Sequence, residues 1–257
     1  VGDSYTFGEM VAQEDIFPEV TERLLRKRFP EKRFEVMNFG VRGADMVRNL
    51  NDLREATEKY GPDILFLCFV PNDFTDDEQF RIFVQNYRNA EKRLKILAPL
   101  EKYSQLARFL DWTIFQFRGN QRSNHLVLLN QSFMKTKNPF YHQKHRALRE
   151  AVREISLRKG AVLFFPYFLS HDEKDLFYYR QGLYTVKGVC DAQKVPFLEV
   201  WENLKDKPFN QWWASPLNHH PNREAHARTA QLVVETLVRE GMIPETEGMR
   251  AEEGAKK

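Results

Sequence analysis

The sequence contains few cysteines and no long apolar run. Cys68 and Cys190 are its two cysteines, too few for a disulfide framework, and no redox or metal spacing links them. No apolar run reaches the roughly 18 residues needed to cross a bilayer, and no signal peptide is recognisable. Excess charge of one sign is also lacking, because 39 basic residues stand against 36 acidic ones. A net charge of +3 gives no reason to expect a nucleic-acid partner.

The sequence starts without a methionine, and only Val1 precedes the turn that begins at Gly2. A strand leading into this turn would need several more residues. We therefore expect this sequence to be a fragment of a longer chain. Missing upstream residues can carry a signal or an anchor, so cytoplasmic and exported locations both stay open.

The composition is that of a globular protein, with 42% hydrophobic and 29% charged residues. A length of 257 residues suits one sizeable α/β domain, which we place at residues 1–244. Residues 76–144 are less regular, and we expect a helical insertion there. Residues 245–257 are polar and are predicted to form a disordered tail.

Helical and strand patterns alternate along the chain. Helices are predicted at 14–28, 44–60, 145–159, 178–193 and 222–240, and strands at 33–37, 63–70, 161–165 and 196–200. This alternation predicts a parallel sheet with helices on both faces. In such sheets, sites gather beyond the carboxyl ends of the strands.

Four separate segments are predicted to meet at that edge of the sheet. They are the Gly2-Asp3-Ser4 turn, the loop 38–43, Asn72 after a buried strand, and His220 after the last strand. A serine hydroxyl becomes a good nucleophile when an imidazole lies within hydrogen-bond reach. Backbone N–H groups and an asparagine amide are suitable donors to the oxyanion of an acyl-transfer intermediate. Together these residue types indicate nucleophilic catalysis by serine.

In their order along the chain, Gly2-Asp3-Ser4, Gly43, Asn72-Asp73 and His220-Pro221-Asn222 resemble the motifs of the SGNH (GDSL-type) hydrolase superfamily. The resemblance implies a flavodoxin-like three-layer α/β/α fold with a mostly parallel five-stranded sheet, whose first strand is nearly absent here. It also implies that Ser4 is the nucleophile and His220 the base. The Ser4 N–H, the Gly43 N–H and the Asn72 amide would form the oxyanion hole.

One position departs from this pattern. Family members usually carry an aspartate two or three residues before the histidine, where this chain has Leu217 and Asn218. The Asn218 carbonyl oxygen can still hold the imidazole. It cannot stabilise the imidazolium by charge, and its NH₂ group could hold the wrong tautomer. We therefore expect a weakened or dyad-type serine esterase.

Other polar and aromatic residues can have either a structural or a functional role. Asp3 and Asp73 are expected to brace loops rather than to act as catalytic acids, and His226 is expected to be a surface or packing residue. Trp213 and His219 are candidates for substrate contact, with simple packing as the alternative. His219 is also an alternative base, although the Pro221-Asn222 sequence favours His220. The histidines and acids lack metal-ligand spacing, so we expect no metal and no cofactor.

Three functions remain open. The leading one is hydrolysis of a small acyl ester, of the acetyl type, on a carbohydrate or lipid through an acyl-serine intermediate. The second is transfer of the acyl group to a sugar hydroxyl by the same residues. The third is a non-catalytic binding module with a degraded triad, for which Asn218 is the main argument.

Overall fold

A computed structural model describes residues 1–74, 104–107, 109–110, 139–166, 173–215 and 218–243. The chain divides into two compact units, one made of residues 1–73 and 143–257 and the other of residues 74–142. Every predicted site residue belongs to the first unit. The predicted helical insertion at 76–144 falls largely outside the described residues, and the predicted tail falls entirely outside them. Both stay predictions.

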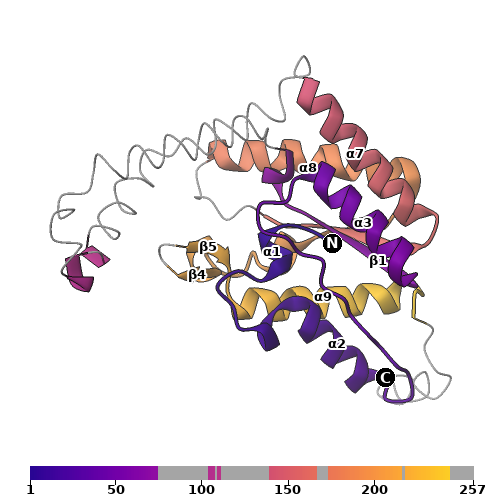
Figure 1. The fold of residues 1–257 in the computed structure, drawn as a ribbon, viewed down its shortest axis with the longest axis horizontal. Helices are drawn as coiled ribbons and strands as arrows, with labels where there is room; N and C mark the ends of the chain where they lie inside the picture. The colour runs from indigo at the N-terminus through magenta and orange to yellow at the C-terminus, as the bar shows by residue number, and fades with distance from the viewer. Residues whose placement is uncertain (75–103, 108, 111–138, 167–172, 216–217, 244–257) are drawn as a thin grey trace. The chain divides into compact units, whose positions relative to one another are not determined.

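The centre of the first unit is a parallel sheet (Figure 1). Its strands are β1 (Ile64–Phe69), β2 (Lys159–Phe164) and β3 (Phe197–Glu199), hydrogen-bonded in that order and in parallel. On the other side of β1, Gly2 forms parallel bridges to both Cys68 and Gly40. If the Gly2 segment, the Gly40 segment, β1, β2 and β3 are numbered 1 to 5 along the chain, their order across the sheet is 2-1-3-4-5. This is the strand order of flavodoxin-like folds. The predicted fold class is confirmed.

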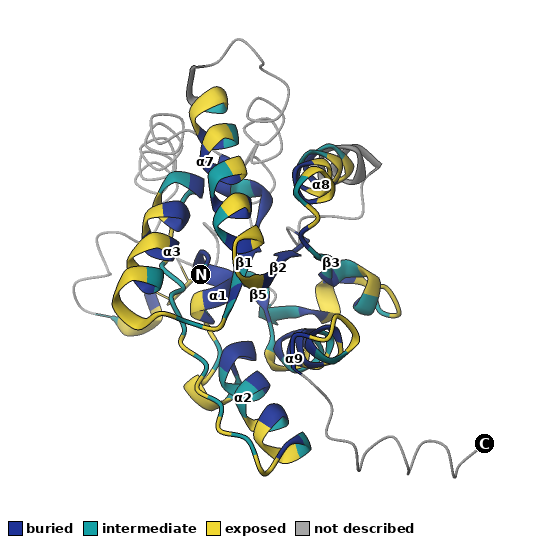
Figure 2. Cartoon of the chain, turned by 90° about the vertical axis from the view of Figure 1, so that its right-hand side faces the viewer, coloured by how far each residue is buried: buried dark blue, intermediate teal, exposed yellow. Residues whose placement is uncertain are grey.

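Helices cover both faces of this sheet (Figure 2). The helices α3 (Met46–Tyr60), α7 (Pro139–Ser156) and α8 (Glu173–Gln193) lie on one side, and α2 (Phe17–Arg28) and α9 (Arg223–Arg239) on the other. Alternate β2 residues such as Ala161 and Leu163 belong to the buried cluster formed with α2 and α9. Among the described residues, no helix is long and apolar enough to cross a membrane.

Helix boundaries follow local capping signals. The Asn222 side chain accepts a hydrogen bond from the Ala225 N–H at 3.0 Å and so caps the start of α9. Asp45 caps α3 in the same way, through the N–H of Arg48 at 2.8 Å. Gly61, in the left-handed conformation, ends α3. The helices predicted at 44–60 and 222–240 are therefore present with small shifts of their ends.

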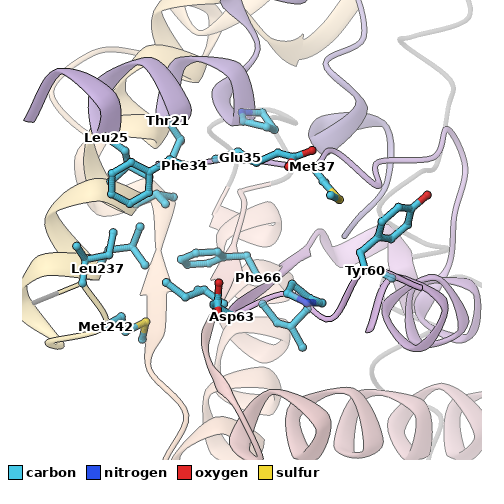
Figure 3. A pocket seen from close by; sticks show the side chains of 18 of the residues that line it. Thr21, Leu25, Phe34, Glu35, Met37, Tyr60, Asp63, Phe66, Leu237 and Met242 are labelled. Atoms are coloured by element: carbon cyan, nitrogen blue, oxygen red, sulfur yellow. The ribbon is translucent and has the colours of Figure 1, made fainter. Parts of the chain in front are cut away.

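The strand predicted at 33–37 is not formed. A parallel strand needs a neighbour along its whole length, and here the neighbouring segment offers a single bridge between Gly2 and Gly40. A cavity of about 1330 Å³ lies between this segment, β1, α2 and α9. Figure 3 shows the apolar side chains around it, among them Leu25, Phe66 and Leu237. Residues 33–37 include the apolar side chains on which the strand prediction was based, but no neighbouring strand among the described residues is hydrogen-bonded to them.

A short antiparallel hairpin precedes α9. Its strands are β4 (Trp213–Ser215) and β5 (Asn218–Pro221). The N–H and the side-chain amide of Asn222 donate to the carbonyl oxygens of Trp212 (2.8 Å) and Gln211 (2.7 Å). Asn222 therefore fastens the end of the hairpin while it caps α9. No strand was predicted in this segment from its sequence.

Candidate active site

Ser4 is the first residue of α1 (Ser4–Phe7), a helix of one turn directly after the Gly2 bridge. The Asp3 carboxylate caps this turn by accepting a hydrogen bond from the Tyr5 N–H at 2.9 Å. Gly8, with φ of 83°, ends the turn in the left-handed conformation that glycine adopts without strain. The nucleophile candidate therefore lies on a tight, capped turn at the carboxyl end of the sheet.

The loop 38–43 is fastened to this turn by hydrogen bonds. The Val41 N–H donates to the Gly2 carbonyl oxygen at 2.9 Å. The Asn38 side-chain amide donates to the Thr6 carbonyl oxygen at 3.0 Å. Two segments separated by more than thirty residues in the sequence are thereby held side by side.

Two positions of this loop favour glycine for different physical reasons. A Cβ at Gly40 would lie 2.1 Å from the backbone nitrogen of Phe7, so Gly40 allows the two backbones to approach closely. Gly43 has φ of 68°, a conformation that other residues rarely adopt, and is exposed. Its predicted oxyanion role stays a prediction.

His220 lies on β5, and β5 contacts α1. Its Nε2 atom is 2.9 Å from the hydroxyl oxygen of Ser4. Its Nδ1 atom is 2.6 Å from the side-chain oxygen of Asn218. The predicted nucleophile, base and third residue therefore form a continuous chain of contacts, across 216 positions of sequence between Ser4 and His220.

The contacts of Asn218 determine the tautomer of His220. The backbone N–H of His220 donates to Asn218 Oδ1 at 3.0 Å. Since a backbone N–H only donates, this atom is the carbonyl oxygen and not the NH₂ group. The same oxygen then accepts from Nδ1, which therefore carries the ring hydrogen. Nε2 is left with the lone pair that can receive the Ser4 proton, so the amide does not hold the wrong tautomer.

The electrostatic surroundings keep His220 neutral. Burial lowers its pKa, the positive charge of Arg42 lowers it further, and the negative charge of Glu9 opposes both by raising it. A neutral imidazole near pH 7 is the form that can accept a proton from a hydroxyl group.

Glu9 was not predicted as part of the site. Its Oε2 atom lies 3.7 Å from His220 Nε2. The Arg42 Nε atom lies 3.5 Å from the same carboxylate oxygen. Sequence spacing gives no signal for this contact, because it depends on how the chain turns after Gly8.

Asn72 lies in the 3₁₀ turn Pro71–Phe74 that follows β1. Its side-chain NH₂ donates to Asp3 Oδ2 at 3.2 Å, and the Ser4 hydroxyl lies 3.4 Å from that oxygen. Asn72 is therefore beside the nucleophile, and one of the two N–H groups of its amide is oriented by Asp3. Whether Asn72 donates to an oxyanion stays a prediction.

Two buried aspartates brace the loops around the site. Burial raises the pKa of Asp3 to about 6, although the hydrogen bonds that Asp3 accepts lower it. Burial also raises the pKa of Asp73 well above its ordinary value. Asp73 accepts hydrogen bonds from the Asn49 side chain at 3.2 Å and from the Val70 N–H at 3.1 Å. Both aspartates have the loop-bracing contacts expected of them.

Trp213 and His219 form a stacked pair on the hairpin that carries the candidate base. Their ring centroids are 3.9 Å apart and their planes differ by 22°. The Tyr5 hydroxyl donates to the His219 carbonyl oxygen at 3.4 Å. The ring that reaches Ser4 belongs to His220, so His219 is less suited to act as the base. A substrate contact by Trp213 or His219 stays a prediction.

His226 is buried in the core. Its Nδ1 atom accepts a hydrogen bond from the Phe17 N–H at 3.1 Å, and the two rings stack with centroids 6.0 Å apart. This agrees with the packing interpretation. In the described part of the chain, no group of histidines, cysteines and acids is arranged to hold a metal ion.

Residues 1–183 match the GDSL-like Lipase/Acylhydrolase family. The chain belongs to this family. The matched residues include Ser4, Gly43 and Asn72, and they end before Asn218 and His220. The resemblance seen in the motifs is confirmed, and this GDSL-like chain is an ester hydrolase.

Solved structures share the fold of this GDSL-like hydrolase. TesA is 15% identical with a TM-score of 0.53, and the match covers 92% of this chain and 94% of that chain. A catalytic mutant of Axe2, an acetylxylan esterase from Geobacillus stearothermophilus, is 16% identical with a TM-score of 0.52, covering 91% and 90%. LAE5, an alpha/beta hydrolase enzyme from the metagenome of Lake Arreo, Spain, is 15% identical with a TM-score of 0.52, covering 91% of each chain. A search of curated proteins found no match.

Proposed function

We propose that this protein is a serine esterase that removes a small, acetyl-type acyl group from a carbohydrate or lipid through an acyl-serine intermediate. The observation that carries the proposal is the contact of 2.9 Å between Ser4 Oγ and His220 Nε2. It is supported by the hydrogen bond that places the ring hydrogen on Nδ1. A serine hydroxyl paired with a neutral imidazole is the arrangement that generates an attacking oxygen.

The reaction proceeds in two halves. His220 Nε2 takes the Ser4 proton while Oγ attacks the ester carbonyl carbon and forms a tetrahedral intermediate. The intermediate expels the alcohol, which takes the proton from Nε2, and an acyl-serine remains. Water then gives a proton to Nε2 and attacks the acyl carbon, and the carboxylic acid leaves as Ser4 recovers its proton.

The negative oxygen of each intermediate needs donors. We assign this role to the Ser4 N–H, the Gly43 N–H and the Asn72 amide. Support comes from the hydrogen bond between the Val41 N–H and the Gly2 carbonyl oxygen, which holds the Gly43 loop beside the Ser4 turn. Loss of one such donor typically lowers kcat by about 10²–10³-fold.

The substrate class is inferred from the hairpin that carries the base. The stacked, half-buried rings of Trp213 and His219 lie on the same hairpin as His220 and are of the kind that packs against a sugar ring or an acyl chain. An acetylxylan esterase with the same fold gives independent support for an acetylated carbohydrate. The acetyl group is therefore the first acyl group to test.

The decisive experiment combines turnover with covalent labelling. The wild-type protein should hydrolyse p-nitrophenyl acetate and should gain one adduct from a fluorophosphonate, which mass spectrometry should locate on Ser4. Ser4→Ala and His220→Gln should lose at least about 10³-fold in turnover. Ser156→Ala, which alters an exposed serine at the end of α7, is the matched control and should behave as wild type.

Three results would count against this function. Turnover by Ser4→Ala equal to wild type would mean that another group performs the chemistry. Absence of both turnover and labelling in the wild type would favour a binding module. Activity that requires an acyl donor and a sugar hydroxyl, and that does not release free acid, would favour the acyltransferase.

A further inference from the structure

The carboxylate of Glu9 lies beside the ring nitrogen of His220 that faces Ser4. Glu9 Oε2 is 3.7 Å from Nε2, whereas the neutral oxygen of Asn218 contacts the other ring nitrogen, Nδ1. The Glu9 and His220 side chains are 24% and 25% exposed, so neither charge is fully screened by water. A carboxylate at this distance favours the protonated form of an imidazole.

Glu9 is positioned by the same turn that carries the nucleophile. Its backbone N–H donates to the Ser4 carbonyl oxygen at 3.2 Å, just after the chain reverses at Gly8. Arg42 lies 3.5 Å from the carboxylate oxygen that faces His220. The Arg42 guanidinium in turn lies over the Phe7 ring, 4.9 Å from its centroid. Glu9 is therefore held in place both by its backbone hydrogen bond and by the ion pair between its carboxylate and Arg42.

We propose that Glu9 is a positioning residue that supplies the negative charge missing at Asn218, by stabilising the imidazolium of His220 from the side of Nε2. This inference rests on the proposed function, because the imidazolium forms when Ser4 transfers its proton. The proton passes from Ser4 Oγ to Nε2 and then to the leaving alcohol, while the Glu9 carboxylate stays ionised. No bond to Glu9 forms or breaks.

Other groups also act on the protonation of His220. Burial opposes the imidazolium most strongly, and Arg42 opposes it with its positive charge, while Glu9 favours it. The Arg42 side chain is 61% exposed, so solvent screens its charge more than that of Glu9. Among the described residues, the other titratable groups near the pair are Tyr5, whose ring centroid is 5.3 Å from that of His220, and Asp3, which lies 3.4 Å from the Ser4 hydroxyl. The imidazoles of His219 and His226 are also close enough to interact with His220.

The first test measures the pKa of His220 directly and needs no turnover. The His220 ring is followed by NMR during a pH titration of the wild type, Glu9→Gln and Glu14→Gln. Glu9→Gln should lower the pKa of His220, because it removes the charge that raises it. Glu14→Gln removes an exposed carboxylate of the same segment and should leave that pKa unchanged. An unchanged pKa in Glu9→Gln would overturn the inference.

The second test uses the pH profile of kcat/KM. Glu9→Gln should shift the acidic limb to lower pH and should lower the plateau by about fivefold to tenfold. Adding Asn218→Asp to Glu9→Gln should move the limb back to higher pH and recover the plateau, because a carboxylate is then restored at the other ring nitrogen. Merely structural damage would lower the plateau without moving the limb, and that result would also overturn the inference.

The two proposals can fail separately. If the wild type neither turns over nor reacts with the fluorophosphonate, the proposed function fails. The NMR titration would still decide whether Glu9 stabilises the His220 imidazolium. If turnover and labelling are present and the titration shows no effect of Glu9→Gln, the esterase stands and the role of Glu9 is wrong.

Discussion

The side-chain oxygen of Asn218 accepts hydrogen bonds from two nitrogens of one residue, the backbone nitrogen of His220 at 3.0 Å and its Nδ1 atom at 2.6 Å. The imidazole is thereby fixed to the backbone of its own strand. An uncharged amide oxygen can orient the ring in this way, but it supplies no negative charge to stabilise an imidazolium.

Asn218→Asp should therefore make the enzyme faster. A carboxylate can accept both hydrogen bonds and adds the charge that raises the pKa of His220. Because the tautomer is already correct here, we expect a gain of about tenfold to a hundredfold in kcat/KM, less than the roughly 10⁴-fold effect of the comparable change in a serine protease. Steady-state kinetics across pH would measure it, with Asn218→Ala as the slower control. A carboxylate variant slower than wild type would contradict the assignment.

Asp3 should make stability depend on pH in the acidic range. Its pKa is raised from 3.8 to about 6, so the folded chain binds the proton more tightly than the unfolded chain does. The resulting stabilisation is present below the unfolded pKa and is lost as the pH rises through about 6, by at most about 3 kcal/mol. The Asp3→Asn variant lacks this loss. The difference in free energy of unfolding between Asp3→Asn and wild type should therefore shift in favour of the variant as the pH rises from about 4 to about 7.

Urea denaturation at both pH values would measure this change, with Asp191→Asn on the exposed side of α8 as the control. A difference between Asp3→Asn and wild type that is constant with pH would show that Asp3 titrates normally in the folded protein.

His226 should have the opposite pH dependence. Burial, followed by the charge of His220, lowers its pKa from 6.5 to about 4. The folded chain therefore binds this proton less tightly, and stability is lost as the pH falls from about 6.5 to about 4, by roughly 3–4 kcal/mol at most. His226→Gln keeps an acceptor for the Phe17 N–H and should lose less stability on acidification. Equal losses in the two proteins, measured by denaturation, would refute this.

Gly40 and Gly43 should respond differently to alanine. A Cβ at position 40 would lie 2.1 Å from the Phe7 nitrogen, so Gly40→Ala must displace the α1 turn and should cost more than about 3 kcal/mol and most of the activity. At Gly43 a Cβ meets no described atom within 4 Å, and only the φ of 68° is unfavourable. Gly43→Ala should cost roughly 1–2 kcal/mol and keep its N–H. Thermal melts with turnover assays would compare them, and equal effects would contradict the close backbone contact.

Long periodic elements were predictable from the sequence because each buries its own apolar stripe. The helix predicted at 178–193 is found at Glu173–Gln193, and the strand predicted at 63–70 is found at Ile64–Phe69. The strand predicted at 33–37 failed for a different reason. Its apolar residues are present, but strand formation depends on a neighbour, which a local pattern does not contain.

The site was predictable where a residue follows directly from a strand or a turn. Ser4 and His220 meet as expected, Ser4 at the carboxyl end of the parallel sheet and His220 on the hairpin that contacts α1. The hairpin that carries His220 was missed, since its strands have only three and four residues. The Glu9 contact was missed because it depends on the left-handed conformation of Gly8, which reverses the chain and brings Glu9 to His220. Residue spacing along the sequence does not predict such a reversal.

Asn222 joins the hairpin to α9, through one hydrogen bond that caps the helix and others to Trp212 and Gln211. We therefore expect fraying of the first turn of α9 to loosen the strand that carries His220. Amide hydrogen exchange of the Ala225 N–H, which donates to the Asn222 side chain, would measure how often this helix end opens. Helix-end opening and displacement of His220 are then expected to be coupled.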